Sequence, residues 1–297
     1  MSGAATPRGA GAARGAEAQT PTGAAPFHAS PPRRGSRETA IFLYELLDAL
    51  PACAHVLDAG CGPGSWDYAR RSDLQITGFD VKFPPGPPVL RSGLRVFRGD
   101  LARLPLREDA FDLTVCHYVL EHVTELEACC DELARVTKPG GTLYLSVPRA
   151  AAFDDRLYRF AGYFAKFALL KWSKRIEHQQ RFDFQGLLDL FYSRGMALAG
   201  YARVPAGFSW MNDARTKPLQ GPFTRCVSLL HRATGIDLGR DANFVMRFEK
   251  TGAIGLRQVT QVCRECGEHS IIEGAPWPDE WTCPWCGKPN PLGRPRA

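Results

Sequence analysis

Seven residues near the start of the chain have the types and spacing of a ligand-binding turn. Asp58 ends a short apolar run and is followed by glycines at alternate positions, Gly60, Gly62 and Gly64. Glycines allow a tight turn and a close approach of backbone to a ligand, because a Cβ atom would block both. A dinucleotide fingerprint, G-x-G-x-x-G, would place its third glycine at position 65, which is Ser65. The spacing therefore argues against a nicotinamide or flavin cofactor.

Four cysteines near the other end of the chain form a second group with chemical potential. Two Cys-x-x-Cys pairs, Cys263/Cys266 and Cys283/Cys286, are separated by 16 residues. This spacing is typical of a structural zinc ribbon, and a module of this size depends on its metal for folding. Trp281 before the second pair also resembles a rubredoxin knuckle, so iron is the alternative to Zn²⁺. Ten cysteines in a chain expected to be cytoplasmic indicate thiols and metal ligation before disulfides.

Strands and helices alternate around the glycine turn. The apolar patterns predict strands at 56–58, 74–80, 94–97, 111–116, 142–147, 197–204 and 243–248, and helices at 36–47, 65–71, 123–137, 184–194 and 222–233. Such alternation predicts an α/β fold, a Rossmann-like seven-stranded mostly parallel sheet with helices on both faces. A Lys-Pro-Gly-Gly turn at 138–141 is expected before the fifth strand.

Composition divides the chain into three parts. Residues 1–35 are rich in Ala, Gly, Pro and Arg and predict a disordered tail. Residues 36–252 form the α/β domain, with a lid or insert at about 151–180 and at about 205–238. Residues 258–290 form the zinc-ribbon module. The formal charge of +6 at 44% hydrophobic content is ordinary for a soluble chain, and no secretory signal pattern is present, which predicts a cytoplasmic protein.

These motifs, taken in order, resemble the class I S-adenosylmethionine-dependent methyltransferases, and among them the quinone-biosynthesis-like small-molecule group. Asp58 to Gly64 is similar to the first motif of that family, and Asp80 stands where an acid holds the ribose hydroxyls. Asp100 and Leu101 match the segment that reads the adenine, and residues 111–123 match the segment along the methionine half. The resemblance implies that S-adenosylmethionine is held by Asp58, Gly60, Cys61, Gly62, Gly64, Asp80, Asp100, Leu101, Cys116 and His117.

Methyl transfer from a sulfonium is an in-line displacement in which the protein chiefly orients the reactants. A general base is needed only for a hydroxyl or a protonated amine acceptor. The candidates are His117, His122 and His178, each with a packing or structural role as the alternative, and Tyr118 and Glu121 in the same segment after the fourth strand. The sequence alone does not single out one of them as a base.

The acceptor is predicted to be a small molecule or a lipid-like molecule. Residues 151–256 contain 16 Lys and Arg against nine Asp and Glu. An aromatic and basic stretch at about 153–174 is either a lid helix over the acceptor pocket or an interfacial helix that contacts a membrane. The alternatives are methylation of RNA or of a protein recruited by the ribbon, or a non-catalytic scaffold that binds the cofactor.

The ribbon is predicted to contact a protein partner or to cap the domain. Residues 257–297, which include the ribbon, contain five basic and five acidic side chains, whereas phosphate binding needs a basic surface. Nucleic acid is therefore disfavoured as a partner.

Overall fold

The computed structural model describes residues 36–62, 64, 66–82, 94–150, 179–205, 217–234, 241–252, 258–266, 269–272 and 279–291. The predicted tail at 1–35, the aromatic and basic stretch at about 153–174, and His178 lie outside these residues.

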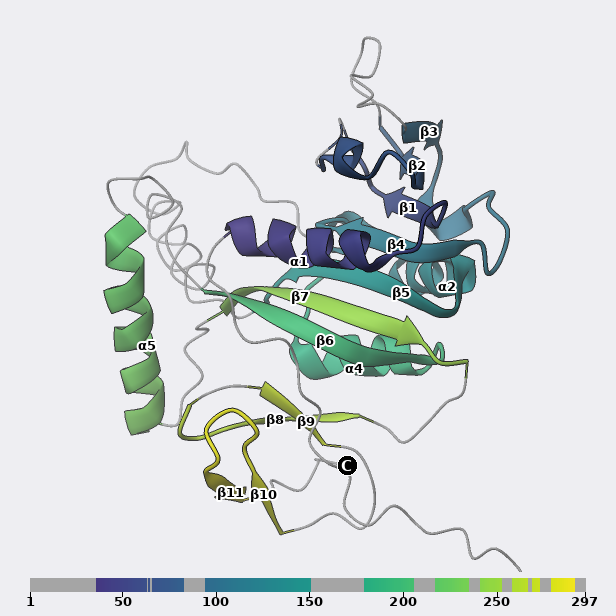
Figure 1. Cartoon of the computed structure of the whole chain (residues 1–297). Helices are drawn as coiled ribbons and strands as arrows, with labels where there is room; N and C mark the ends of the chain where they lie inside the picture. Colours follow the sequence, from purple (N-terminus) through teal and green to yellow (C-terminus); the bar gives the residue numbers. More distant parts are fainter. Residues whose placement is uncertain are drawn as a thin grey trace, which may run out of the picture.

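Seven strands form one twisted sheet in the order β3-β2-β1-β4-β5-β7-β6 (Figure 1). The strands are β1 His55–Ala59, β2 Gln75–Asp80, β3 Leu94–Arg98, β4 Phe111–His117, β5 Thr137–Pro148, β6 Met196–Pro205 and β7 Asp241–Lys250. The first five are parallel, and β7 is antiparallel to β5 and β6. The predicted fold class is confirmed. The order reverses between β1 and β4, where open α/β sheets bind ligands at the carboxyl ends of their strands.

Helices cover both faces of the sheet. On one face α1 Ser36–Ala49 buries Phe42, Leu43 and Leu47 against Val56 and its neighbours. On the other face α2 Leu126–Val136 and α4 Phe184–Tyr192 pack on Leu57 and its neighbours. Val56 and Leu57 are adjacent in β1 and point to opposite faces, so this strand contributes an apolar side chain to each half of the core.

In the described ranges, the domain also contains four short 3₁₀ helices and one further α-helix. The 3₁₀ helices are η1 Tyr68–Arg71, η2 Leu101–Arg103, η3 Leu120–His122 and η5 Lys217–Leu219, and the last leads into α5 Gln220–Thr234. In Figure 1 α5 stands beside the sheet, outside its two helical layers. Among the described residues, no helix is both long and apolar enough to cross a bilayer.

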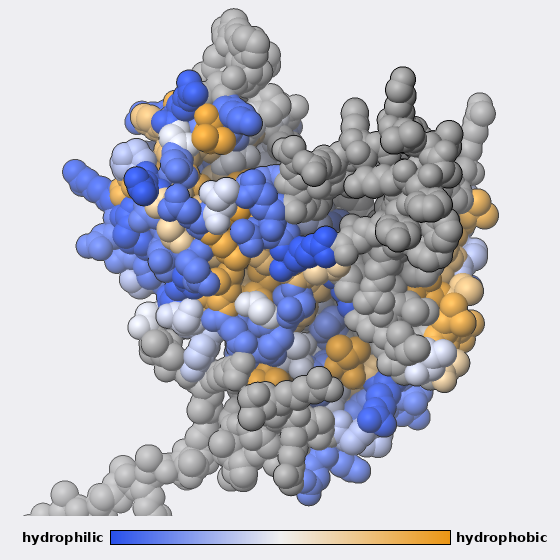
Figure 2. Space-filling view, turned by 180° about the vertical axis from the view of Figure 1, so that it is seen from behind, coloured by the Kyte–Doolittle hydropathy of each residue, from blue (hydrophilic) through white to orange (hydrophobic). Residues whose placement is uncertain are grey.

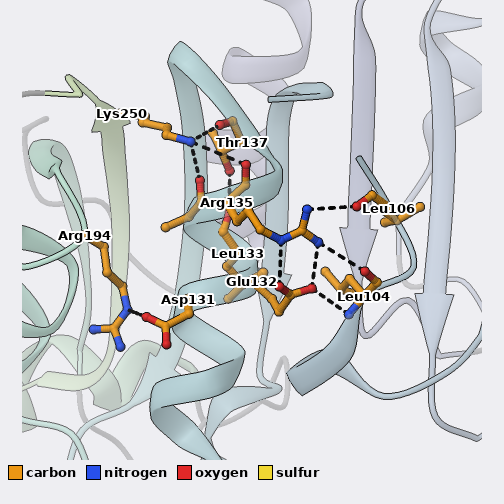
Figure 3. A network of polar contacts seen from close by, with 10 residues as sticks. Leu104, Leu106, Asp131, Glu132, Leu133, Arg135, Thr137, Arg194 and Lys250 are labelled. Atoms are coloured by element: carbon orange, nitrogen blue, oxygen red, sulfur yellow. Dashed lines mark hydrogen bonds and ion pairs between the residues drawn. The ribbon is translucent and has the colours of Figure 1, made fainter. Parts of the chain in front are cut away.

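A polar clasp fixes the loop after η2 to helix α2 (Figure 3). Arg135 donates to the carbonyl oxygens of Leu106 (2.9 Å) and Leu104 (3.1 Å) and pairs with Glu132 at 2.7 Å. Glu132 in turn accepts from the Leu104 amide at 2.7 Å, and the hydrogen bond from Arg135 lowers the pKa of Glu132. The clasp therefore holds the end of the segment that begins at Asp100.

Two predicted local structures differ from the structure. The helix predicted at 65–71 is reduced to η1, because Trp66 and Tyr68 are both buried and two residues apart, a spacing that one helix face does not provide. The turn predicted at 138–141 is an irregularity inside β5: Thr137 already pairs with Phe111, and the register then shifts. Lys138 is held there by Asp112 at 2.8 Å.

Two small hairpins form the C-terminal module. β8 Val259–Val262 pairs with β9 His269–Ile272, and β10 Glu280–Thr282 pairs with β11 Pro289–Pro291. The module lies below β6 and α4 in Figure 1.

Candidate cofactor site and cysteine cluster

The glycine turn after β1 has the left-handed backbone that its composition predicts. The φ angles are +86° at Gly60, +49° at Gly62 and +93° at Gly64. A Cβ on Gly60 would clash with Cγ2 of Val119, which comes from the segment after β4, whereas a Cβ on Gly62 would meet none of the described residues within 4 Å. Gly60 thus serves packing between the two loops, and Gly62 borders open space.

Backbone and side-chain bonds tie this turn to the end of β2. The carbonyl oxygen of Phe79 accepts from the amides of Gly60 (2.6 Å) and Cys61 (3.2 Å). Oδ2 of Asp80 accepts from the amide of Gly62 at 2.8 Å, and Oδ1 accepts from Lys82 N at 2.8 Å. Each carboxylate oxygen has a further lone pair, so Asp80 retains the capacity to accept from a diol. The structure places Asp80 directly beside the glycine turn.

Asp58 is a buried acid at the end of β1. Its side chain is 2% exposed and accepts a hydrogen bond from the Tyr68 hydroxyl at 2.8 Å. Burial raises the pKa of Asp58 from 3.8 to about 7, the Tyr68 bond lowers it, and the nearby Asp80 raises it further. Tyr68 was not among the predicted site residues. Its signal in the sequence is an aromatic hydroxyl ten positions after the acid, which is too weak without the fold.

The segment after β3 brings Asp100 and Leu101 into the same region. Asp100 is exposed, and its Oδ1 caps η2 by accepting from Ala102 N at 2.9 Å. Its Oδ2 has no hydrogen-bond partner among the described residues. Leu101 is 8% exposed and packs in the core. The capping role that Asp residues commonly have is therefore present, with one oxygen left for a ligand.

Two predicted residues, Cys61 and Cys116, are buried thiols. Cys61 is 1% exposed, and burial raises its pKa to about 12. Cys116 is fully buried at the end of β4, and burial raises its pKa well above the usual value. Neither forms a thiolate near neutral pH, so both pack rather than react.

His117 lies half-buried at the end of β4, next to the aromatic rings of Trp66 (centroids 4.7 Å apart) and Tyr118 (4.3 Å). Burial lowers the pKa of His117 to about 4, and its buried Nδ1 has no hydrogen-bond partner in the part of the chain that the structure describes. Trp66 is a contact that sequence reasoning missed. Tyr118 follows with a φ of +53°, which is uncommon for a residue other than glycine.

The next two residues of interest differ in burial. Glu121 is 2% exposed, burial raises its pKa, and its Oε2 has no hydrogen-bond partner among the described residues. His122 is about half exposed, and its Nε2 lies 4.0 Å from Glu121. The structure therefore places Glu121 inside the domain and His122 at its surface, while His178 lies outside the described residues.

The four cysteine sulfurs of the C-terminal module converge. All four Sγ atoms lie within 4.8 Å of one another, with 3.7 Å between Cys263 and Cys286 and 3.6 Å between Cys266 and Cys283. A tetrahedron with Zn–S bonds of about 2.3 Å has edges of about 3.8 Å, so the cluster has the size of a metal site. Asn290 donates to the sulfur of Cys263 at 3.4 Å.

The module sits directly on the α/β domain. The imidazole of His269 stacks on the ring of Phe184 in α4, with centroids 4.4 Å apart and an interplanar angle of 7°. The backbone oxygen of His269 accepts from the Tyr201 hydroxyl of β6 (2.5 Å) and from Trp285 (2.9 Å). Gln185 of α4 donates to the Gln258 carbonyl at 3.1 Å.

Comparison with known proteins agrees with this geometry. Residues 57–145, which contain the glycine turn, β2 to β4 and most of β5, match the family model described as a methyltransferase domain. The chain carries a methyltransferase domain. The predicted resemblance to class I S-adenosylmethionine-dependent methyltransferases is confirmed over this part of the chain, and a cysteine cluster accompanies it in the C-terminal module.

The curated relatives of this methyltransferase domain differ in their acceptors. A tRNA (carboxymethyluridine(34)-5-O)-methyltransferase of Arabidopsis thaliana is 33% identical over 37% of this chain and 28% of its own length. A demethylmenaquinone methyltransferase of Lactiplantibacillus plantarum is 31% identical over 32% of this chain and 45% of its own. A malonyl-[acyl-carrier protein] O-methyltransferase of Pseudescherichia vulneris is 33% identical over 30% and 37%. The chain thus spans less than half of each of these relatives.

A solved structure shares the fold. The S-adenosylmethionine-dependent methyltransferase of Archaeoglobus fulgidus aligns with a TM-score of 0.50 and 15% identity, over 73% of this chain and 95% of that one. At this identity the match concerns the architecture alone.

Proposed function

We propose that the protein is an S-adenosylmethionine-dependent methyltransferase that acts on a small-molecule or lipid-like acceptor. The observation that carries the proposal is the Asp80 carboxylate, hydrogen-bonded to the amide of Gly62 at the carboxyl edge of a methyltransferase domain. The residues present fit S-adenosylmethionine, the methyl donor. The space beside Gly62 is open, and Asp80 and Asp100 supply carboxylate oxygens.

In the proposed site each acid has a separate task. Asp80 accepts hydrogen bonds from the ribose hydroxyls, and Oδ2 of Asp100 accepts from the adenine amine. Asp58 stands near the end of β1, directly before the turn, and its side chain accepts from the Tyr68 hydroxyl. When bound, the donor supplies a methyl group on a sulfonium that leaves as a neutral thioether, so positioning supplies most of the rate.

No strong base is needed for this chemistry, and none stands out among the described candidates. His117 has a pKa of about 4 and is neutral near pH 7, which makes it a weak proton acceptor. Its contacts with Trp66 and Tyr118 support a role in shaping the pocket. His122 is exposed, in keeping with a surface role. Glu121 is the more enclosed proton acceptor, because its Oε2 is buried and unpaired.

Donor binding tests the cofactor assignment. Titration calorimetry of the full chain with S-adenosylmethionine should show binding, and Asp80→Ala should weaken it about 10- to 100-fold, since a hydrogen bond to an ionised group contributes about 1.5–3 kcal/mol. Asp67→Ala is the matched control, because Asp67 is an exposed acid near the same turn and its side chain does not cap η1. Equal binding by all three proteins would overturn the assignment.

The acceptor class is tested by labelling. Full-length protein is incubated with methyl-labelled donor and a cell extract separated into small molecules, lipids, RNA and protein. Label in the small-molecule or lipid fraction is expected, as for the quinone relative. Label in RNA alone would replace this function by the RNA alternative, which the similarity to the tRNA enzyme favours. Donor binding without label in any fraction would leave a cofactor-binding scaffold.

We further propose that the cysteine cluster holds one structural Zn²⁺. The sulfur spacing, the Asn290 contact at Cys263 and the absence of an open coordination position in a four-cysteine set support this. Burial raises the pKa of Cys263, but the amides of Cys266 and Glu265 together with Asn290 outweigh it and bring the pKa to about 7, which favours a thiolate ligand.

Elemental analysis of the purified full chain should find one zinc per protein, and the Cys283→Ser/Cys286→Ser variant should lose it. Iron in place of zinc would correct the metal, and stoichiometric zinc in the double variant would refute the site. The His269 and Gln185 contacts support a capping role for the module. A protein partner at the ribbon stays a prediction.

A further inference from the structure

Helix α5 presents its apolar side to solvent. At 100° per residue, Pro222, Cys226, Leu229, Leu230 and Ala233 fall within an arc of about 100°, and all five are exposed. Leu229 is 63% exposed and Leu230 is 47% exposed. Soluble domains place such an arc against their core, so its outward direction indicates that something else covers it.

The same apolar surface extends beyond the helix. Leu219 in η5, directly before α5, is 51% exposed and falls within the arc at the same rotation per residue. Val227 falls about 60° outside the arc, is buried at 3% exposure and anchors the helix to the protein. Figure 2, seen from behind, shows apolar residues gathered on the outer side of the molecule over this helix. The patch therefore lies on the outer side of the described part of the molecule.

The charges of this segment select one class of occupant. Residues 217–234 contain Lys217, Arg225 and Arg232 and no acidic residue. Arg225 is exposed next to the apolar arc and makes no hydrogen bond or ion pair with the described part of the chain. A second copy would bring like charges together, whereas an anionic lipid surface offers the opposite charge and an apolar layer beneath it.

We propose that α5 is an interfacial helix that binds an anionic membrane surface, with its leucines in the acyl boundary and Arg225 at the headgroups. With 15 residues, α5 is about 22 Å long and lies along the surface rather than across the bilayer. Arginine beside an apolar face is suited to this position, because its stem packs on acyl chains while its charge reaches phosphate. The proposal goes beyond methyl transfer and concerns a surface outside the donor site.

Vesicle co-sedimentation of the full chain tests the proposal. Vesicles of phosphatidylglycerol and phosphatidylcholine should bind the protein, and vesicles of phosphatidylcholine alone should bind it at least 10-fold more weakly. Raising the salt from about 0.05 M to about 0.5 M should reduce the binding, since exposed charges are then screened.

Variants locate the surface. Leu229→Ser/Leu230→Ser and, separately, Arg225→Glu should each weaken binding at least 10-fold, while Val81→Ser, at an exposed apolar residue after β2, should leave it unchanged. Thermal unfolding and donor binding of the variants should match those of the wild type, which separates this result from a failure of the proposed methyltransferase function. Equal vesicle binding by wild type and both variants overturns the proposal. No vesicle binding by the wild type overturns it as well, and a dimer that the leucine variant dissociates assigns the patch to a second copy.

Discussion

Asp58→Asn should stabilise the ligand-free protein selectively at alkaline pH. Asp58 is 2% exposed, and its pKa rises from 3.8 to about 7 on folding, chiefly through burial. The folded state thus binds the proton more tightly than the unfolded state, so stability falls as the pH rises from about 4 to about 7 and is level above that. At about 1.4 kcal/mol per pH unit, the loss is on the order of 4 kcal/mol over the whole range and about 2 kcal/mol between pH 5.5 and 8.5.

Asparagine does not titrate, and its side-chain oxygen still accepts from Tyr68, which lies 2.8 Å from Asp58. Urea unfolding at about pH 5.5 and about pH 8.5 measures the effect. The stability of the variant relative to the wild type should rise by about 2 kcal/mol between the two conditions. Tyr68→Phe should have the opposite effect and make the wild-type loss steeper, because it removes the hydrogen bond that lowers the pKa of Asp58.

Asp112→Asn provides the control. The pKa of Asp112 is lowered by Lys138 and by the amide of His55, which together outweigh its partial burial. Its stabilising contribution is therefore present above the unfolded pKa and is lost only as the pH falls through the lower, folded value. The stability difference between Asp112→Asn and wild type should stay constant between pH 5.5 and 8.5. The same constancy for Asp58→Asn would refute the reasoning about the buried acid.

Three further predictions concern the glycine turn and the ribbon. Gly60→Ala should lower the free energy of unfolding by about 2–4 kcal/mol, because the new Cβ would clash with Val119 and φ is positive, whereas Gly62→Ala should lower it by only about 1–2 kcal/mol. Gly62→Ala should still impair binding of S-adenosylmethionine. Urea unfolding and calorimetry measure the two effects, and equal stability of the two variants would contradict the packing argument. Asn290→Ala should weaken zinc binding about 10-fold in a chelator competition at neutral pH, because it removes the hydrogen bond to the sulfur of Cys263. Unchanged zinc affinity would show that this hydrogen bond does not support metal binding. Phe184→Ala should lower the free energy of unfolding, measured by thermal unfolding, by about 3–5 kcal/mol, because it removes a buried ring stacked on His269. A loss below about 1 kcal/mol would show that packing of the module does not depend on this stacking contact.

The positions of the strands along the chain and of the glycine turn were predictable because their signals are local. Apolar runs marked β1 to β5, and Gly60, Gly62 and Gly64 indicated a tight turn, in which the structure gives all three a positive φ. The helix predicted after Gly64 was wrong, because tertiary burial of Trp66 and Tyr68 outweighed local helical propensity. The distance of Asp80 from the turn also needed the parallel pairing of β1 with β2, which brings residues 18 positions apart into contact.

The sequence by itself determined the glycine turn after Asp58 and the two Cys-x-x-Cys pairs of the C-terminal module. Both features depend on residue type and on short spacings along the chain. Only the tertiary structure decided that Tyr68 holds Asp58, that Gly60 makes room for Val119 and that His269 seats the ribbon on Phe184. It also decided that the apolar arc of α5 faces outward. Burial, pKa and exposure are set by every element that packs around a residue, and residues distant in sequence supply most of those neighbours.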